Sequence, residues 1–117
     1  MNVLIVDDNQ ASADLLQELL MLQDHTACCT YTGQEALAAA AREDFDVALV
    51  DLTLPDFPGT VVGQRLREGG NDKPRLIVAI SGYAATDHAG APGLFDHHLQ
   101  KPIDFGDLDR ILASAAA

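Results

Sequence analysis

Three short runs rich in aliphatic residues, at 2–6, 46–50 and 75–80, recur along this chain. Two less apolar runs, 26–30 and 97–100, complete the series. Runs as apolar as the first three suit strands that are buried on both faces, as in a parallel sheet covered by helices. Because helical segments alternate with these strands through short connections, we predict an α/β fold with a doubly wound, five-stranded parallel sheet.

Five helices are predicted between and after these strands. The first carries leucines at helical spacing, and Thr32 and Glu35 form a capping box at the start of the second. Asp104 is expected to cap the last helix, and the alanine tail 113–117 is expected to fray. The predicted helices cover approximately residues 11–23, 32–42, 59–68, 84–91 and 104–112, and the fourth is short because Gly90, Pro92 and Gly93 end it.

Length and composition indicate one globular domain, residues 1–117, with 48% hydrophobic and 21% charged residues. No apolar run approaches the roughly 20 residues that cross a bilayer, and no basic segment opens a signal peptide. We therefore expect a cytoplasmic domain without membrane contact. The net charge of −11 argues against direct binding of nucleic acid, because the phosphate backbone favours basic surfaces.

Polar side chains stand where four of the predicted strands end. Asp7 and Asp8 follow the first strand, Asp51 follows the third, Ser81 the fourth and Lys101 the fifth. In an open parallel sheet the ligand site lies outside the carboxyl ends of the strands. These groups should therefore converge into a pocket that handles a cation and a phosphoryl group.

Each of these residues also has an ordinary structural interpretation. Asp8 or Asp51 alone could cap the next helix, Ser81 could begin a turn, and Lys101 could be a solvated surface charge. Their joint occurrence at strand ends favours the site. The adjacent cysteines, Cys28 and Cys29, form no redox or zinc motif and are interpreted as small hydrophobic residues of a strand.

Four motifs in this order give the chain a resemblance to the receiver domain of two-component response regulators, over essentially its full length. The motifs are Val6-Asp7-Asp8-Asn9, Asp51 with Pro55 and Gly59, Ser81-Gly82, and Lys101-Pro102. The resemblance implies a flavodoxin-like fold with strand order 2-1-3-4-5 and five helices.

The resemblance also implies the phosphoryl chemistry. Asp51 would accept a phosphoryl group from a phosphohistidine on a histidine kinase or a histidine phosphotransfer protein. Lys101 would neutralise a phosphoryl oxygen, and Ser81 would reorient to hydrogen-bond that group. Such a transfer needs positioning and charge compensation more than covalent machinery, which these residue types can supply.

A Mg²⁺ site is implied by the same resemblance. Asp8, Asp51 and the backbone carbonyl of Thr53 would bind the ion directly, and Asp7 would act through water. Mg²⁺ prefers few carboxylates with several waters, and it offsets the repulsion between an attacking carboxylate and a phosphoryl group.

Two features depart from the family's common pattern, and two further positions are expected to tune the lifetime of the phosphoryl group. His98 stands where many receivers carry Tyr or Phe as a switch, so it is expected either to move with Ser81 or to pack at the sheet edge. The interval from Ser81 to Lys101 is about two residues short, which puts the family's usual dimerisation face in doubt and leaves the oligomeric state open. The tuning positions are Thr53 and Tyr83, two residues after Asp51 and Ser81, where family members vary the approach to the phosphoryl group. Tyr83 is expected either to slow the attack of water on the acyl phosphate or to lie on the loop surface. Residues 95–104 resemble receivers of hybrid histidine kinases, so a longer parent protein is favoured.

Other function classes are weaker. A haloacid-dehalogenase phosphatase needs a second Asp two residues after its nucleophile, and Thr53 stands there. A flavodoxin-type cofactor site is disfavoured because the acidic turn at residues 7–9 would repel a phosphate. A receiver-like interaction module that is never phosphorylated remains the alternative. The partner is expected to dock on the first helix, along Ala11, Leu15 and Leu19.

Overall fold

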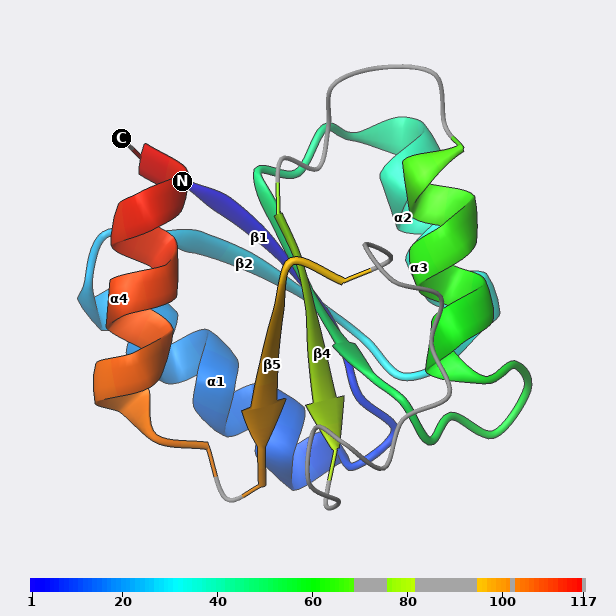
Figure 1. The fold of residues 1–117 in the computed structure, drawn as a ribbon, viewed down its shortest axis with the longest axis horizontal. Coiled ribbons are helices and arrows are strands. Elements are labelled where there is room, and N and C mark those ends of the chain that lie inside the picture. Colours follow the sequence, from blue (N-terminus) through cyan, green and yellow to red (C-terminus); the bar gives the residue numbers. More distant parts are fainter. Residues whose placement is uncertain (69–75, 82–94, 102, 117) are drawn as a thin grey trace.

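The computed structural model describes residues 1–68, 76–81, 95–101 and 103–116 (Figure 1). Five parallel strands form one sheet in the order β2-β1-β3-β4-β5, as predicted. The strands are β1 (Asn2–Val6), β2 (Thr26–Thr30), β3 (Val47–Asp51), β4 (Leu76–Ser81) and β5 (His97–Gln100). The fold is the flavodoxin-like one.

Helices cover both faces of the sheet (Figure 1). The described helices are α1 (Gln10–Leu22), α2 (Gly33–Arg42), α3 (Gly59–Arg67) and α4 (Phe105–Ala116). α1 and α4 pack on one face and α2 and α3 on the other, so the core consists of two separate hydrophobic clusters. The short helix predicted at 84–91 and the position of Tyr83 lie outside the described residues.

Alternation along β1 divides its side chains between the two clusters. Val3 and Ile5 face α1 and α4, whereas Leu4 and Val6 face α2 and α3, and all four are fully buried. Full burial of one such side chain stabilises the fold by about 1.5–3 kcal/mol. Cys28 and Cys29 divide in the same way, and both are free thiols, which agrees with their predicted role as small hydrophobic residues.

Side-chain caps fix the helix starts. The side chain of Asn9 accepts a hydrogen bond from Ser12 N at 3.1 Å, which starts α1 one residue before the predicted position. Thr32 Oγ1 accepts from Glu35 N at 3.1 Å, as the capping box predicts. The other half of the box differs, because the Glu35 carboxylate accepts from the N–H of Tyr31 rather than from that of Thr32.

Several predicted boundaries differ from the structure, and β4, for example, ends at Ser81 rather than at residue 80. β3 extends through Asp51, because this residue still pairs with Ile80 of β4. The tail predicted to fray from 113 instead continues α4 to Ala116. Asp104 caps that helix as predicted, since its carboxylate accepts from Gly106 N at 2.8 Å. Among the described helices, none combines the length and the apolar character that a bilayer crossing requires.

Candidate functional site

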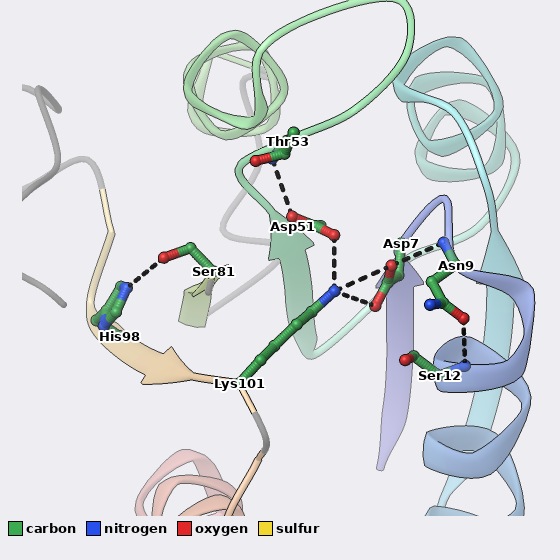
Figure 2. Close-up of polar contacts among 8 residues, drawn as sticks. All are labelled: Asp7, Asn9, Ser12, Asp51, Thr53, Ser81, His98 and Lys101. Carbon is green, nitrogen blue, oxygen red and sulfur yellow. Dashed lines mark hydrogen bonds and ion pairs between the residues drawn. The ribbon is translucent and has the colours of Figure 1, made fainter. Parts of the chain in front are cut away.

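The carboxyl ends of β1, β3, β4 and β5 bring the predicted polar residues to one edge of the sheet (Figure 2). Asp7 follows the last residue of β1, while Asp51 and Ser81 are the last residues of β3 and β4. Lys101 follows β5, and its backbone N–H donates to the Ser81 carbonyl at 2.7 Å. Because backbone hydrogen bonds align the ends of the neighbouring strands, the side chains that follow them lie close together.

Three carboxylates form the centre of this edge. Asp7, Asp8 and Asp51 each offer an oxygen, and these oxygens all lie within 4.8 Å of one another. Asp7 is 0% and Asp51 4% exposed, whereas Asp8 is open to solvent. Two of three like charges are therefore held in a poorly solvated position, which is costly unless a cation compensates them.

Lys101 supplies part of that compensation. Its Nζ lies 3.0 Å from Asp51 Oδ2 and 3.2 Å from Asp7 Oδ2 (Figure 2). Partial burial alone would lower the pKa of Lys101, but the hydrogen bond and the negative charge of Asp51, joined by Asp7, outweigh it and raise that pKa. Lys101 therefore stays an ammonium throughout the physiological range.

The two oxygens of Asp51 have different partners. Oδ1 accepts from the backbone N–H of Thr53 at 2.9 Å, and Oδ2 faces the ammonium of Lys101. Burial nevertheless raises the pKa of Asp51 above its usual value, because desolvation outweighs these two favourable contacts. The carboxylate is fixed in orientation but incompletely neutralised.

The loop after Asp51 closes tightly on itself. Gly59 N donates to the Leu52 carbonyl at 3.0 Å, so the beginning of α3 returns to the end of β3. A Cβ at Gly59 would lie 2.3 Å from the carbonyl oxygen of Asp51. Only glycine permits this approach, which explains the glycine of the predicted motif in physical terms.

The donor set fits a small hard cation. It contains carboxylate oxygens and no sulfur or imidazole among the described residues, which suits Mg²⁺ better than a softer metal. Asp7 Oδ2 is buried and receives no hydrogen bond from the described part of the chain, although the ion pair with Lys101 reaches it. A hydrated cation would offer this oxygen the missing hydrogen-bond donor through one of its waters.

Ser81 and His98 form a pair beside this centre. Ser81 is 1% exposed, and its Oγ lies 3.4 Å from His98 Nε2. Figure 2 shows the hydroxyl directed toward His98 rather than toward Asp51. The structure therefore brings the two predicted switch residues together.

A groove of about 420 Å³ opens next to the acidic centre, between α1 and the segment that connects β5 to α4. Leu15, predicted to face a partner, is 51% exposed on its wall. The groove is lined by Asp7, Ser12, Leu15, Leu16, Lys101, Ile103 and Phe105. Ala11 is exposed and Leu19 half-buried on the same helix.

Asp56 is a residue that the sequence reasoning did not single out. It lies in the loop between β3 and α3, yet its carboxylate binds the backbone N–H groups of Gly33 and Gln34 at the start of α2. The sequence carries only the weak signal of an acidic residue after Pro55, because its partners lie more than 20 positions upstream.

Comparison with known proteins gives a consistent result. A family model described as the response regulator receiver domain matches residues 3–113. A solved CheY-like receiver domain from Methylobacillus flagellatus superposes with a TM-score of 0.89 at 36% identity, covering 98% of each chain.

Curated relatives are longer proteins. The transcriptional regulatory protein PcoR of Escherichia coli is 30% identical over 91% of this chain, which spans 47% of PcoR. The sensor histidine kinase AtsR of Burkholderia thailandensis is 28% identical over 97% of this chain, which spans 19% of AtsR. The chain thus covers less than half the length of these relatives.

Proposed function

The chain belongs to the family of response regulator receiver domains, and from this membership we propose that Asp51 is its phosphoacceptor residue. Receiver domains accept a phosphoryl group from histidine kinases or phosphotransfer proteins in two-component systems. The observation that carries the assignment is the position of Asp51, buried at the end of β3 between the N–H of Thr53 and the ammonium of Lys101. Residues 1–117 would act as one such domain.

In the proposed reaction, the Asp51 carboxylate attacks the phosphorus of a phosphohistidine. An oxygen–phosphorus bond forms while the phosphorus–nitrogen bond breaks, and the imidazole of the donor keeps the electron pair. Lys101, already paired with Asp51, lies where it can neutralise an oxygen of the transferred group. The Thr53 N–H holds the attacking carboxylate in one orientation, which lowers the entropy lost on transfer.

Asp8, Asp51 and the Thr53 carbonyl are the proposed ligands of Mg²⁺, with Asp7 acting through water. When bound, the ion would supply charge compensation for the phosphoryl oxygens. Receiver domains typically bind this ion in an acidic pocket, and the cluster of three carboxylate oxygens fits that role. Because Asp7 is fully buried, solvent screens its carboxylate little.

Ser81 is proposed to leave His98 and to hydrogen-bond the phosphoryl group on Asp51. A phosphoryl group adds negative charge and strong acceptor oxygens, which a hydroxyl donor can satisfy. The 3.4 Å spacing between Ser81 Oγ and His98 Nε2 is long for a hydrogen bond, so little would be lost when it breaks. His98 would then respond to phosphorylation, linking the site to the β5 edge.

The groove beside α1 is the proposed docking place for the phosphohistidine-bearing partner. Its lining includes Leu15 and Phe105, which are 51% and 37% exposed, together with Asp7 and Lys101 of the acidic centre. A partner helix could bury these apolar side chains while it presents its phosphohistidine to Asp51. The charge of −11 favours such a protein partner over nucleic acid, and we propose a cytoplasmic location without membrane contact.

PcoR and AtsR represent two contexts in which such a domain operates, a transcriptional regulator and a sensor kinase. From the resemblance of residues 95–104 to receivers of hybrid histidine kinases, we propose that this chain belongs to such a longer protein. The domain would also catalyse loss of its own phosphoryl group, by admitting water to the acyl phosphate.

The test is incubation with Mg²⁺ and acetyl phosphate, followed by intact mass measurement, with Asp51→Asn as control. One added phosphoryl group that requires both Mg²⁺ and Asp51 would support the proposal. If neither an adduct nor beryllofluoride binding is found, the chain acts instead as an interaction module that is never phosphorylated.

A further inference from the structure

Asp56 joins two elements that are distant in sequence. It lies in the loop of residues 52–58 that follows the phosphoacceptor, and its carboxylate contacts the first turn of α2. Oδ1 accepts from Gly33 N at 2.8 Å, and Oδ2 accepts from Gln34 N at 2.9 Å. Oδ1 also accepts from Phe57 N, within the loop itself, at 2.9 Å. One side chain thus stiffens the loop and fastens it to a helix.

The backbone donors at the start of α2 show that this contact completes the helix cap. The first N–H groups of a helix have no partner within it. Thr32 Oγ1 accepts a hydrogen bond from the N–H of Glu35, and the Thr32 carbonyl accepts one from the N–H of Ala36. The N–H groups of Gly33 and Gln34 are left without a partner within the cap, and the Asp56 carboxylate accepts a hydrogen bond from each.

Packing at Gly33 supports the same junction independently. Gly33 is buried, and a Cβ there would lie 2.5 Å from Cδ2 of Phe57 and 3.0 Å from Cγ2 of Val62. The Phe57 ring therefore lies directly against the α2 backbone. The packing of Phe57 and the two hydrogen bonds of the Asp56 carboxylate therefore both hold the loop of residues 52–58 against the start of α2.

The fastened loop contains the groups that orient the phosphoacceptor. Thr53 lies three residues before Asp56, and its N–H holds Asp51 Oδ1 at 2.9 Å. The loop is closed at its base by the hydrogen bond from Gly59 to Leu52, so its free part is short. If Asp56 moved away from α2, the backbone at Thr53 would therefore move as well.

We propose that Asp56 is a positioning residue of the phosphorylation site, which holds the loop of residues 52–58 against α2 and thereby sets Thr53 against Asp51. This inference rests on the proposed function in so far as the Thr53 carbonyl is a Mg²⁺ ligand. Hydrogen bonds from backbone N–H groups outweigh desolvation and keep the pKa of Asp56 below its usual value, so the contact holds at neutral pH.

The test compares Asp56→Ala with Thr32→Ala. Both substitutions remove caps from α2, but only the first releases the loop, so Thr32→Ala reports the effect of a weakened helix alone. Two quantities are measured by NMR: the hydrogen-exchange protection of the Thr53 amide without metal, and the Mg²⁺ dissociation constant from a titration with MgCl₂. Thermal unfolding shows how far each variant weakens the fold.

Asp56→Ala is expected to lower the protection of the Thr53 amide and to weaken Mg²⁺ binding about tenfold. Thr32→Ala should leave both within about twofold of the wild type while lowering the melting temperature to a similar degree. Asp56→Asn, which keeps one acceptor oxygen, should fall between the wild type and Asp56→Ala.

Equal effects of Asp56→Ala and Thr32→Ala would overturn the inference and leave Asp56 as a helix cap only. If the wild type itself binds no Mg²⁺, the proposed function fails at the metal, yet the exchange protection of Thr53 still decides whether Asp56 positions the loop. The two failures are therefore distinguishable.

Discussion

The ammonium of Lys101 lies 3.0 Å from Oδ2 of Asp51, and the same ammonium lies 3.2 Å from Oδ2 of Asp7. One cation therefore faces two buried carboxylates, with a third carboxylate, Asp8, close by. The site keeps a negative excess that only a further cation can neutralise. This imbalance determines how the domain should respond to mutation and to added metal.

Asp51→Asn should make the apo domain more stable, by about 1–2 kcal/mol. The substitution removes a buried charge whose desolvation outweighs its contacts, and Lys101 keeps Asp7 as its partner. Urea unfolding of both proteins in the absence of divalent ions measures the difference. A loss of stability would mean that attraction to Lys101 exceeds the desolvation of Asp51.

Lys101→Met should have the opposite effect, lowering the free energy of unfolding by about 1–3 kcal/mol. Asp7 and Asp51 would then be buried without their cation, although the 30% exposure of the Lys101 side chain allows some solvation. The matched variant is Lys101→Arg, which keeps the charge and should lose less. Equal stability of Lys101→Met and the wild type would rule out a structural role for this ammonium.

Mg²⁺ should stabilise the folded domain measurably. At ten times its dissociation constant, a ligand that binds only the native state adds about 1.4 kcal/mol. Melting curves in MgCl₂ and in NaCl of equal ionic strength separate specific binding from screening. Asp8→Asn should remove most of the gain, because it deletes a proposed direct ligand, and an unchanged gain in that variant would place the ion elsewhere.

Acid should abolish the contribution of Asp56 to stability. Its pKa is lowered on folding, so the contribution is complete above the unfolded value near 3.8 and disappears as the pH falls through the folded value. The free energy of unfolding of the wild type minus that of Asp56→Asn should therefore shrink toward low pH. A difference that does not depend on pH would show that the carboxylate charge is irrelevant to the cap.

Gly33→Ala should destabilise the domain by about 1–3 kcal/mol, although alanine is the better helix former. The added methyl group would lie 2.5 Å from the Phe57 ring. In a double-mutant cycle, Phe57→Ala should relieve most of this cost, because it removes the clashing atom. Additive costs in the cycle would indicate that the strain arises from another neighbour.

The sequence was sufficient to predict the sheet and the convergence at its edge. Polar residues stand at or just after the carboxyl ends of four strands, and the rule for parallel sheets then places Asp7, Asp51 and Lys101 together. That inference needs no knowledge of loop conformation, because consecutive backbone hydrogen bonds bring the strand ends into line.

The junction between Asp56 and α2 could not be predicted in this way. It depends on how the seven-residue loop 52–58 folds back on the start of a helix, and periodicity carries no information about that. The end of α4 was missed for a related reason. Alanine has high helix propensity, but its small side chain buries little surface against a neighbour. The sequence pattern alone therefore does not show where such a helix ends.

Val6 of β1 pairs with Val50 of β3, and Asp7 and Asp51 each come one residue later along the chain. The backbone positions from which these two carboxylates extend are therefore separated by the strand spacing of a parallel sheet, about 4.8 Å. Aliphatic exchanges in the two clusters should change how easily the domain unfolds without changing this spacing. The hydrophobic interior can therefore diverge widely while the backbone positions that carry these two carboxylates keep their spacing.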